Sequence, residues 1–161
     1  MINLERVKSF LDAHSTMTLA TVGPQGEPQA AAVFYAADER LNLYFLSSPT
    51  SRHSQNLLRD ARVAATIHAD GQAWQAIRGV QIEGAVELVE EVTTLAQAAR
   101  TYAGRFDFVR GLLDDGDDGP VVLRGPVANS RFYVLRPAWI RLIDNTLGFG
   151  HKKEWTLDDD G

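Results

Sequence analysis

From residue 80 to residue 89, apolar and polar side chains alternate almost without a break. One set is Val80, Ile82, Gly84, Val86 and Leu88, and the other is Gln81, Glu83, Ala85, Glu87 and Val89. A repeat of two residues places the two sets on opposite faces of a β-strand. Because the faces are unlike, we predict a long strand in an antiparallel sheet with one face on a core.

Shorter β-prone segments, separated by turn residues, predict the other strands of this sheet. They are residues 18–22, 28–35, 41–46, 63–68, 132–135 and 138–143. Arg136-Pro137 separates the last two segments, and the proline predicts an edge strand or a bend at that point. Gly23 to Gly26 predicts the turn of a hairpin between the first two.

Helical periodicity is confined to the start of the chain and to two connections. Leu4, Val7, Phe10 and Leu11 recur at helical spacing and predict a helix over residues 3–14. A second helix is predicted after an N-cap at Ser48 or Thr50. More helix is predicted between Glu90-Glu91 and about residue 113. Residues 114–120 (DDGDDGP), four of which are aspartates, predict a solvated loop. These elements predict an α+β barrel or sandwich, not a βαβ sheet.

The composition removes several classes of protein from consideration. The chain of 161 residues has no cysteine, which excludes disulfide frameworks, iron–sulfur clusters and thiolate zinc sites. Its formal net charge of −5 argues against duplex nucleic-acid binding. The longest apolar run, residues 30–37, is too short to span a membrane, and charges interrupt the N-terminal segment, unlike in a signal peptide. We therefore expect a cytoplasmic protein that binds neither nucleic acid nor membrane.

The segment from Ser47 to His53 is the clearest candidate site. It follows a predicted strand and begins a predicted helix, so that hydroxyl groups, Arg52, His53 and free backbone N–H groups converge. Such a helix start favours a phosphate monoester, because it carries partial positive charge and an arginine can bind two oxygens at once. The alternative interpretation is a capped helix with an exposed arginine.

Two other segments are weaker candidates. Residues 30–32 are three successive alanines, which either allow a flat ring to approach the strand backbone or simply form a tightly packed core strand. Residues 148–150 (Gly-Phe-Gly) precede Lys152, Lys153 and Trp155, but they lack the loop-and-helix context of a dinucleotide motif.

No residue stands out as a metal ligand or as a catalytic acid, base or nucleophile. The histidines, at positions 14, 53, 68 and 151, have no ligand-like spacing, and phosphate-loop and nucleophile-elbow motifs are absent. We therefore predict no metal site and assign no catalytic residue.

Two long segments carry a resemblance to a known family. TLATVGPQGEPQAAAVFYAADERLNLYFLSSPTSRHSQNLLRDARVAATI (18–67) and IRGVQIEGAVELVE (77–90) resemble the FMN-binding split barrels related to pyridoxamine 5′-phosphate oxidase. The ending DNTLGFGHKKEW resembles a narrower subfamily of small bacterial proteins. The resemblance implies a six-stranded antiparallel split β-barrel with peripheral helices. It implies one domain over 1–161, with a helix at 3–14, the barrel at about 16–143 and a C-terminal segment at 144–161.

The resemblance also implies a homodimer with two FMN sites at the subunit interface. Flavin-binding residues carried over from the family are Ala32, Val33 and Phe34 along the ring, Ser47, Ser51, Arg52 and His53 at the phosphate, Gln81 (or Arg78) at the ring edge, and Lys152 and Trp155 from the C-terminal segment. His53 stands where the family usually has lysine.

The implied function is that of an FMN-dependent oxidoreductase with a small-molecule electron donor or acceptor. The alternatives are a flavin-binding or interaction protein without turnover, and a split barrel that binds deazaflavin or haem, the latter through His68 or His151. Pyridoxamine phosphate oxidation is not expected, because the substrate-binding arginine and histidine run of that oxidase is not visible near the C-terminus.

Overall fold

One large antiparallel sheet organises the structure, a computed structural model that describes residues 2–114 and 120–157. Its strands are hydrogen-bonded in the order β2-β1-β5-β6-β9-β4-β3, and β10 also pairs with β9. The strands are β1 (Thr16–Val22), β2 (Pro28–Phe34), β3 (Ala36–Ala37), β4 (Leu43–Ser47), β5 (Arg62–His68), β6 (Arg78–Leu88), β9 (Arg131–Asp144) and β10 (Lys152–Thr156). The predicted acidic loop falls mostly on residues 115–119, which lie outside the described ranges.

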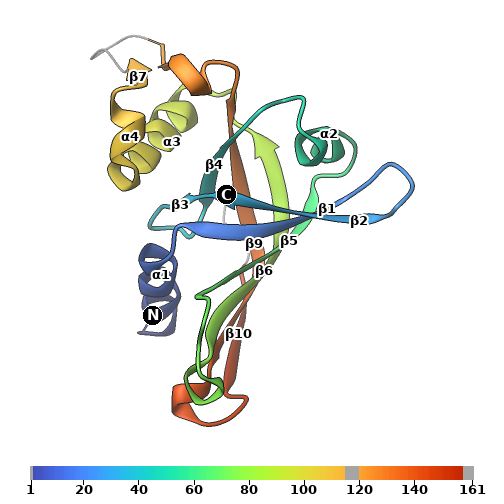
Figure 1. The fold of residues 1–161 in the computed structure, drawn as a ribbon, viewed down its shortest axis with the longest axis vertical. Coiled ribbons are helices and arrows are strands. Elements are labelled where there is room, and N and C mark those ends of the chain that lie inside the picture. Colours follow the sequence, from blue (N-terminus) through green and yellow to red (C-terminus); the bar gives the residue numbers. More distant parts are fainter. Residues whose placement is uncertain (1, 115–119, 158–161) are drawn as a thin grey trace.

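The helices lie around this sheet (Figure 1). They are α1 (Ile2–Ala13), α2 (Arg52–Arg59), α3 (Val92–Arg105), α4 (Asp107–Arg110) and the short 3-10 turns η1 (Trp74–Ala76), η2 (Gly125–Val127) and η3 (Asn145–Leu147). A two-stranded ribbon of β7 (Leu113–Asp114) and β8 (Val122–Leu123) follows α4. The fold is thus α+β, with the curled antiparallel sheet that the sequence predicts.

Consecutive residues of β2 and β3 connect the two edges of the sheet. β2 pairs with β1 at one edge, and β3 pairs with β4 at the other. A segment only ten residues long, from 28 to 37, therefore reaches both edges and bends the sheet into a barrel-like shape. Strands β1, β2, β4, β5 and β6 were predicted, β9 was predicted as two separate strands, and β3 and β10 are additional.

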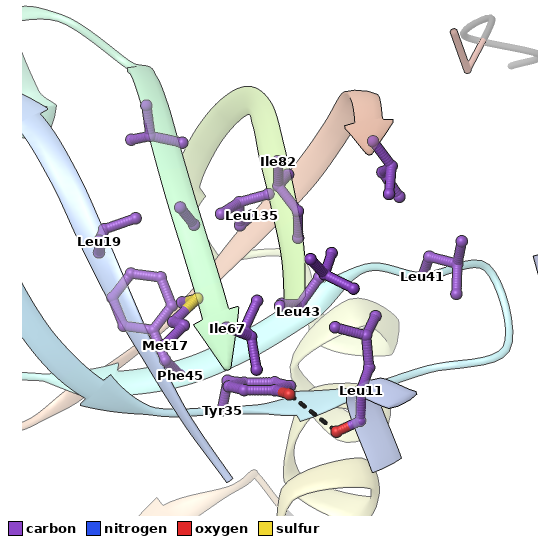
Figure 2. Close-up of a cluster of buried hydrophobic side chains, with 14 of the residues drawn as sticks. Leu11, Met17, Leu19, Tyr35, Leu41, Leu43, Phe45, Ile67, Ile82 and Leu135 are labelled. Atoms are coloured by element: carbon purple, nitrogen blue, oxygen red, sulfur yellow. Dashed lines mark hydrogen bonds between the residues drawn. The ribbon is translucent and has the colours of Figure 1, made fainter. Parts of the chain in front are cut away.

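The barrel interior is filled by alternate side chains of the strands. Figure 2 shows Leu19, Phe45, Ile67, Ile82 and Leu135, which come from five different strands and are almost completely buried. This is the pattern that period-two alternation predicts for one face of each strand. α1 covers one end of the barrel.

A buried hydrogen bond fixes α1 to the barrel. The Tyr35 hydroxyl donates to the Leu11 carbonyl oxygen at 2.8 Å, and both side chains are buried (Figure 2). The periodicity of the first segment therefore predicted both the helix and its buried face.

The prediction of two strands separated by Arg136-Pro137 was wrong, because β9 is one continuous strand in the sheet interior. Its register with β6 shifts between Glu83 and Gly84, and Gly84 lies opposite Pro137. A bulge is a position where a ladder hydrogen bond is not required, so proline is tolerated there. A Cβ atom at Gly84 would lie 2.2 Å from the Arg136 carbonyl oxygen, so the strands approach closely only because residue 84 is glycine.

Strands β6, β9 and β10 continue beyond the barrel as an arm (Figure 1). At its tip the Asn145 amide donates to the Trp74 carbonyl oxygen at 2.7 Å, which joins the η1 and η3 loops. The C-terminal segment, for which no strand was predicted, contributes β10 to this arm.

Candidate functional site

The phosphate-type cluster predicted at residues 47–53 forms where β4 ends and α2 begins. Ser51 is the N-cap of α2, one residue later than the predicted Thr50, and its Oγ accepts from the Ser54 N–H at 3.2 Å. The Ser47 and Ser51 hydroxyl oxygens lie 3.1 Å apart. Within the described part of the chain, the backbone N–H groups of Arg52 and His53 have no hydrogen-bond acceptor. Two unpaired donors at a helix start, beside two hydroxyl groups, form an anion-binding arrangement.

His53 points its imidazole into the same cluster. Its Nε2 atom lies 2.5 Å from Ser47 Oγ, and the ring is about half buried. Burial lowers the pKa of His53 below its ordinary value of 6.5, because desolvation disfavours the imidazolium. The ring is therefore neutral at pH 7 and contributes a polar contact, not the charge of the lysine usual at this position.

Arg52 is the charged member of the cluster and is mostly exposed. Its Nη2 atom lies 3.5 Å from Oε1 of Glu27, which belongs to the turn between β1 and β2. Backbone N–H groups of Glu27 and Gln25, and then Arg52, lower the pKa of the Glu27 carboxyl. The guanidinium thus faces a permanent carboxylate beside the unpaired N–H groups of α2.

A buried polar network fixes α2 against the hairpin of β1 and β2. The Asn56 amide donates to Thr21 Oγ1 at 3.0 Å, and Thr21 donates to Gln29 Oε1 at 3.1 Å. Asn56 and Thr21 are almost completely buried. This network holds the start of α2 close to β2, the strand predicted to support a ring.

The predicted ring strand, β2, has one free edge. Within the described residues β2 pairs only with β1, and the Tyr35 N–H donates to the Ser15 carbonyl oxygen just beyond it. Because hydrogen bonding alternates along an antiparallel pair, the backbone groups of Ala32 and Phe34 point away from β1, while those of Val33 point toward it. Ala32 and Phe34 are also exposed on the outer face, with Phe34 53% accessible. A planar group can therefore approach this backbone.

Gln81 lies on the outer face of the sheet, away from the phosphate-type cluster. Its Oε1 accepts from Arg141 Nη1 at 3.2 Å, at the wall of an open cavity of about 410 Å³. Strands β1 and β5 separate β6 from β2, which corresponds to about 14 Å at the usual strand spacing. Within one chain, Gln81 and Ala32 do not contact one planar ring. Arg78, the alternative, lies three residues earlier on the same strand.

Lys152 and Trp155 are also far from the cluster. Ser47 pairs with Arg131 of β9, whereas Lys152 pairs with Ile143, so about 40 Å of strand separates the two positions. Trp155 is half buried and packs against the barrel core, with the Lys153 ammonium 5.8 Å from its ring centroid. The structure thus brings together Ser47, Ser51 and His53 beside Arg52, and it fixes α2 against the hairpin of β1 and β2. Gln81, Lys152 and Trp155 lie elsewhere in the chain.

Comparison with known proteins agrees with this architecture. Residues 4–143 match the pyridoxamine 5′-phosphate oxidase family. The chain belongs to this family. The UPF0306 protein of Cronobacter sakazakii is 36% identical over 153 residues, which cover 94% of each chain.

Solved structures show the same fold at low sequence identity. The conserved hypothetical protein Rv2991 of Mycobacterium tuberculosis matches with a TM-score of 0.69 and 24% identity, over 97% of this chain and 92% of that one. A haem-binding protein of Mycobacterium smegmatis matches with a TM-score of 0.70 and 21% identity, over 92% of this chain and 56% of that one. These likenesses establish the split-barrel fold of this pyridoxamine 5′-phosphate oxidase family member.

Sequence reasoning missed three polar residues around the site of this family member. Glu27 pairs with Arg52 of the cluster, whereas Thr21 and Asn56 bond to each other and fix α2 against the hairpin. Only Asn56 could have been recognised from the sequence, because it is a polar residue next to Leu57 on the buried face of α2.

The described residues form neither a metal-type cluster nor a membrane-spanning helix. Over residues 2–114 and 120–157, no group of three or more histidine, aspartate or glutamate side chains gathers as in a metal site. None of the helices within those ranges has the length and apolar character needed to cross a bilayer.

Proposed function

We propose that this protein binds FMN and acts as a flavin-dependent oxidoreductase. The observation that carries the proposal is the pair of unpaired N–H groups at Arg52 and His53, set beside the Ser47 and Ser51 hydroxyls and the Arg52 guanidinium. This donor set suits the phosphate of FMN, because backbone N–H groups, hydroxyls and a guanidinium all donate to phosphate oxygens.

The free edge of β2 supports the flavin ring in this proposal. Ala32 and Phe34 offer backbone donors and acceptors to the polar edge of a ring, and the small side chain of Ala32 leaves room for it. Bound FMN supplies hydride and electron transfer to and from a small-molecule donor or acceptor. The chain's own residues hold the phosphate at α2 and orient the ring along β2.

A second copy of the chain completes the site in this proposal. The outer face of β2, β1 and β5 presents small, exposed side chains, including Ala32, Thr18 and Ala64. Since Gln81 lies about 14 Å from β2 in its own chain, its predicted contact with the ring edge requires the partner's β6. Light scattering at micromolar concentration should report a dimer, and a monomer would contradict the shared site.

The first test is an FMN titration followed by absorption and flavin fluorescence. The Arg52→Ala variant should weaken FMN binding roughly tenfold to a hundredfold, because charge-assisted hydrogen bonds to phosphate are lost. Binding of riboflavin, which has no phosphate, should stay unchanged. Equal FMN affinity of the wild type and the variant would refute the phosphate assignment.

Turnover distinguishes the enzyme from a flavin-binding protein without activity. Bleaching of the bound flavin band by NADH or NADPH, and its recovery with an acceptor such as a quinone, supports the oxidoreductase. A flavin that binds tightly but stays oxidised with both donors supports the non-catalytic alternative. Tighter binding of a deazaflavin than of FMN would identify that cofactor instead.

Haem binding is the second candidate, and one observation favours it. His68 and Arg78 line an open cavity of about 360 Å³ at the base of the arm, which places an imidazole and a cation together. One protein with the same fold is named as haem-binding. A Soret band on haem titration that His68→Ala abolishes would support this alternative.

A further inference from the structure

A cavity of about 340 Å³ lies between α1 and the arm of β6 and β9. It is separate from the phosphate-type cluster, because none of residues 47–53 lines it. Its volume falls at the lower end of the range for small-molecule sites. Residues far apart in the chain meet there, with Arg6 and Ser9 from α1, Arg78 from β6, and Thr146 from η3.

Arg6 and Arg78 are the two arginines that line this cavity. Neither side chain makes a hydrogen bond or an ion pair with any residue in the described ranges. Several other arginines form ion pairs: Arg62 with Asp60, Arg136 with Glu87 and Arg141 with Glu154. Two unpaired guanidinium groups at one cavity leave donors for an anion, and an anion bound between them pairs with both.

One acidic residue, Asp144, also lines the cavity, and its carboxylate is already engaged. Its Oδ1 atom accepts from the N–H of Thr146 at 3.1 Å and from the hydroxyl of the same residue at 2.5 Å. This carboxylate caps the η3 turn and pairs with neither arginine. The wall therefore keeps its excess of positive charge.

The remainder of the wall is apolar and selects among anions. Phe10, Leu142 and Leu147 line the cavity beside the arginines. The His14 ring stacks on Phe10 with centroids 4.1 Å apart, and its Nδ1 donates to the Phe10 carbonyl oxygen at 2.8 Å, which fixes the ring. Inorganic ions gain nothing from such a surface, whereas an organic anion buries apolar area there.

We propose that this cavity is a second binding site, which takes a small organic carboxylate. Arg6 and Arg78 bind the carboxylate, and Phe10, Leu142 and Leu147 contact the apolar body of the ligand. The proposal is independent of FMN phosphate binding, because none of residues 47–53 lines this cavity.

The test uses the full-length protein with benzoate as the probe and isothermal titration calorimetry as the measurement. Benzoate should bind the wild type, and Arg6→Gln and Arg78→Gln should each weaken binding at least about tenfold. Because neither arginine has a partner in the described chain, both variants should keep the melting temperature of the ligand-free wild type. Arg110→Gln, which alters an exposed arginine outside the cavity, is the matched control and should leave benzoate binding unchanged.

Three outcomes would overturn the proposal. Benzoate fails to bind, both arginine variants bind it as tightly as the wild type, or inorganic phosphate binds at the same place as tightly as benzoate. The last result would show a simple attraction of ions without recognition of an apolar body.

Discussion

Replacing Asn56 with alanine tests whether the buried network on α2 positions the site. The Asn56 amide is 1% exposed and donates to Thr21 Oγ1 at 3.0 Å, with Gln29 Oε1 at a longer 3.5 Å. Alanine removes this donor and leaves Thr21 with its single bond to Gln29. The contact between α2 and the hairpin then depends on apolar packing and on the exposed Arg52–Glu27 ion pair.

The expected loss of stability follows from these contacts. One net hydrogen bond of about 1 kcal/mol disappears, and the second, longer bond adds a smaller amount. The space left by the amide adds a cavity cost of about 1 kcal/mol. We therefore expect the free energy of unfolding to fall by about 1–3 kcal/mol, and FMN binding to weaken as the start of α2 loses its fixed position.

Urea denaturation followed by tryptophan fluorescence measures the stability, and an FMN titration measures the site. Leu58→Ala is the matched control, because Leu58 lies on the same helix but is 74% exposed. The double variant with Thr21→Val should lose less stability than the sum of the single variants, because the two residues share one bond. A change below about 0.5 kcal/mol for Asn56→Ala, equal to that of the control, would refute the reasoning.

Three further predictions concern the sheet, the charge and the pH dependence. Gly84→Ala should destabilise the fold by about 3 kcal/mol or more in urea, because a Cβ atom 2.2 Å from the Arg136 carbonyl oxygen forces two central strands apart; an unchanged midpoint would contradict the close approach. Glu27→Gln should tighten FMN binding severalfold without affecting riboflavin, because a carboxylate 3.5 Å from Arg52 then no longer repels the phosphate; weaker FMN binding would show that the carboxylate instead holds Arg52 in place. In the flavin-free protein, the free energy of unfolding should fall as pH drops from about 6.5 through the lowered pKa of His53, because the unfolded chain protonates this histidine at a higher pH than the folded chain does. The urea midpoint of the His53→Gln variant should not show this part of the pH dependence. Identical pH profiles of the variant and the wild type would contradict the prediction.

Strands with a clear period of two were predictable because their neighbours in sequence determine which face is buried. The β6 alternation predicted a strand from residue 80, and the structure extends it back to Arg78. The prediction failed at Pro137, where the bulge opposite Gly84 removes the need for the missing N–H group. No strand was predicted for β10, because Lys152–Thr156 is largely exposed and shows no buried face. Its strand conformation depends on its pairing with β9.

The site was predictable where it is contiguous in the chain. Ser47, Ser51, Arg52 and His53 lie within seven residues, so the turn from β4 into α2 brings them together. Glu27 reaches Arg52 only because the hairpin folds back on α2, and no local pattern indicates such a contact. The separation of Gln81, Lys152 and Trp155 from the cluster likewise depends on the order of the strands, which periodicity does not determine.

The ratio of FMN to riboflavin affinity tests the central claim most directly, because the two ligands differ only in the phosphate. Titration of the wild-type protein with each ligand, followed by flavin fluorescence, gives this ratio without any variant. The donors at Ser47, Ser51, Arg52 and the start of α2 predict that FMN binds at least roughly tenfold more tightly. Equal affinities, or no binding of either flavin, would contradict the assignment of this cluster as a flavin phosphate site.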